Sequence, residues 1–234
     1  MENRYNDAEQ EAVNKTFAGE KNKLSKMTFG EKVDYIWTYY KVHILVVLLV
    51  LAVTGWCVHH AMTYVQYKVY GMVINSGQYS AEVEANLHDL LKMDKHDGVG
   101  ITADLYTGDT DSMGGYGDKL TIYVMAGQLD FAFTDEEGVK YLVDMGAVRD
   151  AKDVLPDELL SKWTEEGRLY TMDVTDSDGK TGTFDVAIDI SGSPVHDYFG
   201  LDDNTKYLVI ADLSGSEEYM NNFYELLENI EMGE

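Results

Sequence analysis

One short segment has the residue types of a nucleotide site. Residues 98–103 (GVGITA) match the glycine-rich fingerprint that cradles a dinucleotide pyrophosphate. That fingerprint must follow a strand and open a helix, so that the pyrophosphate meets the helix N-terminus. Here the surrounding pattern predicts the reverse order, a segment that follows a helix and enters a strand. We therefore expect no dinucleotide site.

Three further motif matches overlap in one predicted turn. Residues 177–182 contain a Ser-x-x-Lys and a Lys-Thr-Gly, which penicillin-recognising enzymes place on separate elements, and Lys180 cannot serve both. Residues 176–179 match three positions of a calcium loop, but its twelfth position is Asp185 rather than a bidentate glutamate. No HExxH or GxSxG motif occurs. The sequence thus predicts no enzyme, no cofactor and no metal centre.

Charge and cysteine content exclude several classes of protein. The 234 residues include 42 acidic and 18 basic side chains, for a formal net charge of −24, and a strongly anionic surface repels nucleic acid. One cysteine excludes an intramolecular disulfide and any multi-cysteine metal site. Residues 1–60 sum to zero, so residues 61–234 carry the whole excess. Weak association of divalent cations with these carboxylates stays open.

The most apolar stretch lies between these two parts of the chain. Residues 44–58 contain no charge, and Val42 extends the stretch if His43 is included. At about 1.5 Å per residue this helix would cover about 22–26 Å, slightly less than a hydrocarbon core of about 30 Å. Aromatic residues typical of membrane interfaces flank it on both sides. They are Trp37, Tyr39 and Tyr40 before the stretch and Tyr64, Tyr67 and Tyr70 after it.

Three interpretations of this stretch compete: a buried core helix, a cleaved signal peptide and an uncleaved membrane anchor. A signal peptide would need a cationic region of about forty residues, and Ala61 has His59 rather than a small residue two positions upstream. A lipoprotein site at Cys57 fails because Trp56 precedes it. The pattern therefore favours an uncleaved anchor that contacts the lipid bilayer.

The lysines around the stretch set its expected orientation. Four lysines lie just before the stretch and one lies just after it, so the positive-inside rule places the N-terminus in the cytoplasm. We expect a cytoplasmic tail with a juxtamembrane amphipathic helix over residues 1–41, a transmembrane helix over residues 42–64 and an acidic extracytoplasmic domain over residues 65–234. Residues 28–31 (TFGE) read as a capping box. The amphipathic segment either lies along the inner leaflet or forms the first turns of one long helix. The lysines that determine the expected orientation are Lys23, Lys26, Lys32 and Lys41 before the apolar stretch and Lys68 after it.

Beyond residue 65 the pattern alternates between strands and helices. It predicts one compact α/β domain of mixed α and β structure. Thr134 is expected to cap a helix, and residues 176–179 are expected to turn a hairpin. In the second arm of that hairpin, alternation predicts an apolar face and an acidic face. The apolar face would hold Phe184, Val186, Ile188 and Ile190, and the acidic face Asp185 and Asp189. Strands are expected at residues 69–75, 99–106, 130–133, 169–174, 183–190 and 207–211.

Two parts of the chain resemble known families. Residues 27–45 (MTFGEKVDYIWTYYKVHIL) resemble the juxtamembrane segment of small single-pass envelope proteins of Gram-positive anaerobes. The outer domain is similar to type II extracellular solute-binding proteins, whose two lobes enclose a ligand cleft. The resemblance implies a shortened, solute-binding-like lobe, in which the membrane helix replaces the usual lipid-modified cysteine. The matching segments are residues 126–130, 135–163, 188–194 and 207–211.

The resemblance also implies where a ligand would bind. In open α/β sheets, ligands sit at the carboxyl ends of the strands. The expected ligand-binding side chains are Thr134, Asp135, Ser191, Ser193 and Tyr198. The same residue types also serve as helix caps and turn residues, and this second interpretation stays open.

Two functions remain. The first is a non-catalytic, membrane-anchored binding module of the solute-binding type that captures a small solute. The second is an envelope interaction or transporter-accessory domain that contacts a membrane-protein partner and takes no small ligand. A single lobe favours docking over clamping.

Overall fold

The computed structural model describes residues 18–19, 21–22, 25, 27–107, 116–175 and 181–233. The chain forms two compact units, residues 1–64 and residues 65–234. We call the second the α/β unit and describe each unit by itself. The turn predicted at residues 176–179, with the motifs it carries, and most of the N-terminal tail lie outside the described residues.

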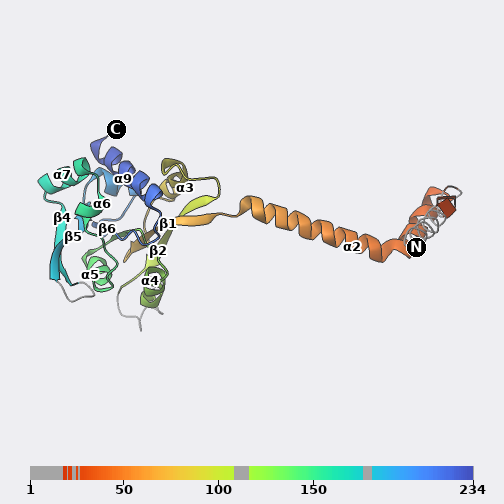
Figure 1. Cartoon of the computed structure of the whole chain (residues 1–234), viewed down its shortest axis with the longest axis horizontal. Coiled ribbons are helices and arrows are strands. Elements are labelled where there is room, and N and C mark those ends of the chain that lie inside the picture. Colours follow the sequence, from red (N-terminus) through yellow and green to blue (C-terminus); the bar gives the residue numbers. More distant parts are fainter. Residues whose placement is uncertain are drawn as a thin grey trace, which may run out of the picture. The chain divides into compact units, whose positions relative to one another are not determined.

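The first unit is built on one long helix, α2 (Phe29–Thr63; Figure 1). It runs without interruption through the juxtamembrane segment and the apolar stretch. The juxtamembrane segment therefore forms the first turns of one long helix, which is one of the two expected arrangements. At its start, the Thr28 backbone N–H donates to Glu31 Oε2 at 2.8 Å, which is the reciprocal half of a capping box. Within the described residues, no side chain of α2 is buried. Its length and composition therefore suit a membrane-spanning helix.

The α/β unit contains one mixed sheet, which confirms the predicted fold class at that level. Among the described residues its six strands follow the order β2-β1-β3-β6-β5-β4. β1, β2 and β3 are parallel, β6 is antiparallel to β3, and β5 is antiparallel to both β6 and β4. Their bounds are β1 (Gln66–Ile74), β2 (Asp97–Leu105), β3 (Phe131–Thr134), β4 (Leu169–Thr175), β5 (Thr181–Asp189) and β6 (Tyr207–Ile210).

Helices cover both faces of this sheet (Figure 1). One face packs against α3 (Ala81–Leu90), α6 (Ala151–Val154), α7 (Asp157–Glu165), α8 (Pro194–Phe199) and α9 (Glu217–Met232). The other packs against α4 (Tyr116–Met125) and α5 (Glu136–Asp144). A sheet covered on both faces explains why its central strands are continuously apolar rather than alternating.

Aromatic rings fill the larger of the two cores. The Phe131 ring of β3 stacks on Phe223 of α9 with centroids 4.3 Å apart, and the Phe133 ring lies 4.7 Å from Phe199 of α8. Trp163 of α7 is fully buried in the same core. These contacts tie the C-terminal helices to the centre of the sheet.

The predicted two-faced alternation of β5 is wrong. Val186 packs in the core on the α4–α5 side, whereas Ile188 packs in the core on the α9 side. The register explains the change, because Tyr170 pairs with Ala187 and Thr171 with Asp185, which leaves Val186 as a bulge residue. Asp185 is accordingly buried rather than solvent-facing.

The predicted helix cap at Thr134 is also wrong, by one residue. Thr134 is the last residue of β3 and is fully buried, and Asp135 caps α5 by accepting the Gly138 backbone N–H at 2.9 Å. Gly138 lies directly over Thr134, since a Cβ at Gly138 would stand 1.9 Å from Thr134 Oγ1. The α5 helix therefore starts in close contact with the end of β3.

Candidate functional site

The connections of β1 and β3 create a topological switch point. The chain leaves β1 towards α3 on one face of the sheet and leaves β3 towards α5 on the other face. Such neighbouring strands open a crevice at their carboxyl ends, where α/β proteins bind ligands. We call this end of the sheet the carboxyl edge and the opposite end the amino edge.

A hydrogen-bonded cluster lies at the carboxyl edge beside this switch point. Asn75, directly after β1, has a left-handed φ of 62° and donates from Nδ2 to Asp135 Oδ1 at 2.7 Å. The same amide group donates to Thr107 Oγ1 at 2.9 Å, and Asn75 Oδ1 accepts the Thr107 backbone N–H at 2.8 Å. The cluster thus ties together the ends of β1, β2 and β3.

Two of the expected ligand-binding residues cap helices, and a third is buried at the end of β3. Asp135 caps α5, and Ser193 is fully buried and caps α8 by accepting the His196 backbone N–H at 3.3 Å. Thr134 is fully buried, and its hydroxyl has no hydrogen-bond partner in the described structure. The positions of Asp135 and Ser193 agree with the interpretation as helix caps, whereas Thr134 caps no helix.

The other two expected residues lie beyond β5. Ser191 is exposed in the turn that follows β5, and its carbonyl accepts from Arg168 Nη1 at 3.2 Å. Tyr198 packs on Phe199 and lines a shallow depression of about 670 Å³ with residues of α8 and α9. Their contact with a ligand stays a prediction.

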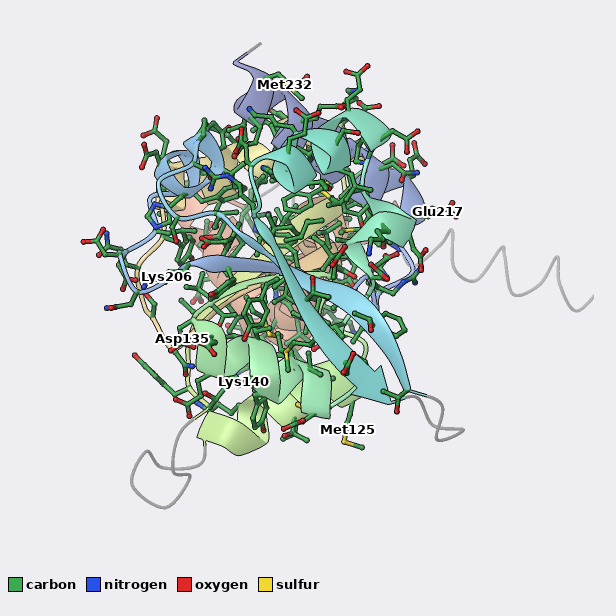
Figure 2. All side chains as sticks on the ribbon, turned by 90° about the vertical axis from the view of Figure 1, so that its left-hand side faces the viewer. Met125, Asp135, Lys140, Lys206, Glu217 and Met232 are labelled. Carbon is green, nitrogen blue, oxygen red and sulfur yellow. The ribbon has the colours of Figure 1, made fainter. Side chains whose placement is uncertain are left out.

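The backbone of Lys206 connects the two groups of expected residues. Its N–H donates to the Thr134 carbonyl at 3.0 Å, and its carbonyl accepts the Ile190 N–H at 2.8 Å. The five residues therefore share the carboxyl edge, where Figure 2 shows Asp135 and Lys206 on one side of the α/β unit and Glu217 on the opposite side.

A more enclosed cavity lies at the amino edge, between the end of β6, α6 and the start of α9. It has a volume of about 430 Å³ and combines charged, polar and apolar side chains. Asp212 is the acidic side chain around which we describe it, and we call it the Asp212 cavity. Its lining residues are Arg149, Asp153, Val154, Asp212, Gly215, Glu217, Met220, Asn221 and Tyr224.

A buried aspartate holds the loop that carries Asp212. Asp130 Oδ2 accepts the Tyr70 backbone N–H and its Oδ1 accepts the Ser214 backbone N–H, both at 2.8 Å. The Asp130 carbonyl also accepts the Asp212 N–H at 3.0 Å. These contacts hold Asp212 in a left-handed conformation with φ of 50°. Burial raises the pKa of Asp130, and its two backbone hydrogen bonds oppose that shift.

Two residues that line the cavity, Asp212 and Tyr224, each have one buried polar atom without a partner. Among the described residues, Asp212 Oδ1 and the Tyr224 hydroxyl make no hydrogen bond, and the Tyr224 side chain is only 5% exposed. Burial raises the pKa of both groups, and nearby Asp212 raises that of Tyr224 further. Arg149 Nη1 lies 3.8 Å from Asp212 Oδ2 and lowers the Asp212 pKa in part. Unpartnered buried polar atoms are costly, and strain, a bound water or a functional role can explain each of them.

Sequence reasoning missed this cavity. Arg149, Asp212 and Tyr224 come from three separate segments, and Tyr224 sits in an apolar helix face where it reads as a core residue. One available signal was the polar Asp212 directly after an apolar strand, although β6 is antiparallel and places it at the amino edge. Within the described residues, no group of three or more His, Cys, Asp or Glu side chains could hold a metal ion.

Comparison with protein-family models, with curated proteins and with solved structures finds no match to the chain.

Proposed function

We propose that this chain is a single-pass, membrane-anchored binding module that presents the α/β unit outside the cytoplasm and takes a small ligand into the Asp212 cavity. The observation that carries the proposal is the Asp212 cavity, whose lining residues Asp212 and Tyr224 each hold one buried polar atom without a partner in the described structure. Each such atom costs about 1–3 kcal/mol unless something satisfies it. The α/β unit would correspond to one solute-binding-like lobe of an envelope protein.

The anchor part of the proposal is supported by α2. Its 35 residues extend about 52 Å, enough to cross a hydrocarbon core of about 30 Å and continue into an interface. Every large apolar side chain between Val42 and Val58 is more than a third exposed to the surroundings of the protein, except Ile44. Lipid is the solvent in which such a surface is stable, and the lysines before the span favour a cytoplasmic N-terminus.

The chemistry of the Asp212 cavity suffices for recognition. Its lining offers carboxylates, a guanidinium and a phenol. Recognition needs only such fixed polar groups beside an apolar wall.

A second candidate function, docking of a membrane-protein partner, is favoured by α4. Ile122 and Met125 of this helix are 64% and 82% exposed. An exposed apolar pair on the helix beside edge strand β2 suits a protein interface.

The proposed function can be tested with the full chain in phospholipid nanodiscs. Thermal unfolding would be measured against sugars, amino acids, peptides, organic ions and divalent cations. A ligand that binds only the folded state at 100 times its Kd stabilises it by about 2.7 kcal/mol. We expect one class to raise the midpoint of the wild type and to act more weakly on Tyr224→Phe than on the matched control Tyr198→Phe.

The two candidate functions predict different results. Loss of the shift in Tyr198→Phe but not in Tyr224→Phe would move the site to the carboxyl edge. No shift with any compound, together with a membrane protein crosslinked through residue 122 or 125, would support the docking function instead.

A further inference from the structure

The sheet has a free edge at β2. This strand is the first in the sheet order, and among the described residues only β1 pairs with it. Residues 69–72 of β1 pair in regular register with residues 99–102 of β2. In such a ladder, alternate residues turn their backbone groups to the same side. The Ile101 N–H donates to Glu84 Oε1 at 3.2 Å instead of to β1, so Ile101 and Val99 turn their backbone groups to the free edge.

Such an edge is a template for a further strand. Outward N–H and C=O groups of an edge strand can pair with an extended chain that lies beside them. Proline and lysine commonly block an edge, but β2 contains neither, and its two aspartates lie near its ends. The contact from Glu84 covers one outward N–H group with a side chain that an incoming carbonyl can displace.

A hollow of about 330 Å³ adjoins this edge, and we call it the Glu84 hollow. Glu84 of α3 and Tyr123 of α4 both line it. Figure 1 shows these two helices on opposite sides of β1 and β2, and they pack in different cores. Gly100 and Ile101, in the middle of β2, also line the hollow. It therefore reaches from one face of the sheet to the other around the free edge.

The Glu84 hollow offers a carboxylate and an aromatic ring. Among the described residues that line it, Glu84 is the one charged side chain, and residues 61–234 carry the whole net charge of −24. Tyr67 also lines it and is 53% exposed. Its ring lies over Gly100, because a Cβ there would stand 3.2 Å from Tyr67 Cδ1. A carboxylate and the face of a tyrosine ring both attract a cation, so the hollow suits a lysine or arginine side chain.

We propose that β2 binds an extended basic segment of a partner protein, which adds a strand to the sheet and places one lysine or arginine side chain in the Glu84 hollow. A carbonyl of the segment replaces Glu84 at the Ile101 N–H, and the released carboxylate pairs with the basic side chain. The Tyr79 hydroxyl, 2.7 Å from Glu84 Oε2, keeps the carboxylate beside the edge. A second copy of the chain is disfavoured, because two strongly anionic units would meet. This inference does not rest on the Asp212 cavity.

Fluorescence anisotropy with the full chain in phosphatidylcholine nanodiscs tests the inference. The probe is a labelled nine-residue peptide of alternating valine and threonine with a central lysine, and a matched peptide carries norleucine instead. We expect the lysine peptide to bind about 5-fold more tightly. Two further lysine peptides carry N-methyl groups on alternate amides, one set along each edge of the extended peptide. One of these should bind at least about 10-fold more weakly, because only one edge of the peptide pairs with β2.

Variants of the hollow and a matched control locate the site. Glu84→Gln keeps an acceptor for the Ile101 N–H but removes the charge, so it should weaken the lysine peptide about 3- to 5-fold and leave the norleucine peptide unchanged. Tyr67→Leu should weaken the lysine peptide by a similar factor. Glu82→Gln removes the same charge from an exposed position of α3 and should change neither peptide by more than about 1.5-fold. A wild-type-like circular dichroism spectrum verifies that each variant is folded.

Four results would overturn the inference. Equal binding of the lysine and norleucine peptides, or equal effects of the two N-methyl sets, would exclude the hollow or the strand pairing. Equal weakening by Glu84→Gln and Glu82→Gln would mean general attraction to the acidic surface. Dimerisation of the full chain that the lysine peptide competes away, measured by sedimentation in detergent, would assign β2 to a second copy. Absence of peptide binding would refute the inference alone, because the thermal screen decides the proposed function separately.

Discussion

Asn75 Nδ2 donates a 2.7 Å hydrogen bond to Asp135 Oδ1, although the two residues lie 60 positions apart in the chain. The bond joins the end of β1 to the first turn of α5 across the switch point of the sheet. It occupies the Asn75 amide and one carboxylate oxygen of Asp135, two of the polar groups at the carboxyl edge. This relationship is one reason why we assign the ligand to the Asp212 cavity at the amino edge.

Substitutions at Asn75 should separate its conformation from its hydrogen bonds. Asn75→Gly keeps the left-handed φ of 62° but removes the bonds to Asp135 and Thr107, at an expected cost of about 1–2 kcal/mol in unfolding free energy. Asn75→Ala adds a left-handed strain of about 1 kcal/mol. Denaturant unfolding of the full chain, followed by near-UV circular dichroism, measures both. Equal stability of the two variants would contradict the assigned conformation.

Stability at acidic pH should depend on Asp202. Although burial alone would raise its pKa, hydrogen bonds from Ser76 and Thr205 lower it. A lowered folded pKa contributes stability that is complete above the pKa of an unfolded aspartate, about 3.9, and is lost as pH falls through the folded value. Asp202→Asn should therefore cost about 1–2 kcal/mol at pH 7 and progressively less below about pH 4. The exposed variant Asp203→Asn should show no such pH-dependent difference from the wild type.

The sign is reversed at Asp212. Burial raises its pKa, so its contribution to stability is largest when it is protonated and is lost as pH rises through the folded pKa. Asp212→Asn should therefore increase the unfolding free energy by about 0.5–1 kcal/mol at pH 7, with the gain vanishing at low pH. Thermal unfolding between pH 3 and pH 8 measures this difference. A variant less stable than the wild type at pH 7 would mean that the carboxylate is a structural group rather than one kept for a ligand.

The buried hydroxyl of Thr134 offers a test of the carboxyl edge. Its Oγ1 has no partner in the described structure, so Thr134→Val replaces an unsatisfied group by a methyl group of similar size. We expect stability to stay equal or to rise by up to about 1 kcal/mol, with ligand binding unchanged. A loss of ligand binding in this folded variant would restore Thr134 as a binding residue.

The sequence carried enough information for the membrane-type helix and the strands but not for the cavity. The apolar stretch that became α2 and the strands of the sheet follow from hydropathy and periodicity, which are local properties. The bulge at Val186 was not predictable, because pairing with β4 determines it rather than the alternation within β5. The shift of the α5 cap from Thr134 to Asp135 has a similar cause, since β3 extends one residue further when it pairs with β6. The Asp212 cavity depends on three distant segments that only the packed fold brings together.

The most direct test of the account is the sidedness of the α/β unit in intact cells. Cys57 is the one cysteine of the 234 residues, so Cys57→Ala gives a background into which Asp203→Cys or Ser25→Cys can be introduced. A membrane-impermeant maleimide should label Asp203→Cys in intact cells and should label Ser25→Cys only after the membrane is permeabilised. Labelling of Ser25→Cys in intact cells, or protection of Asp203→Cys until permeabilisation, would contradict a membrane-anchored module with its binding unit outside.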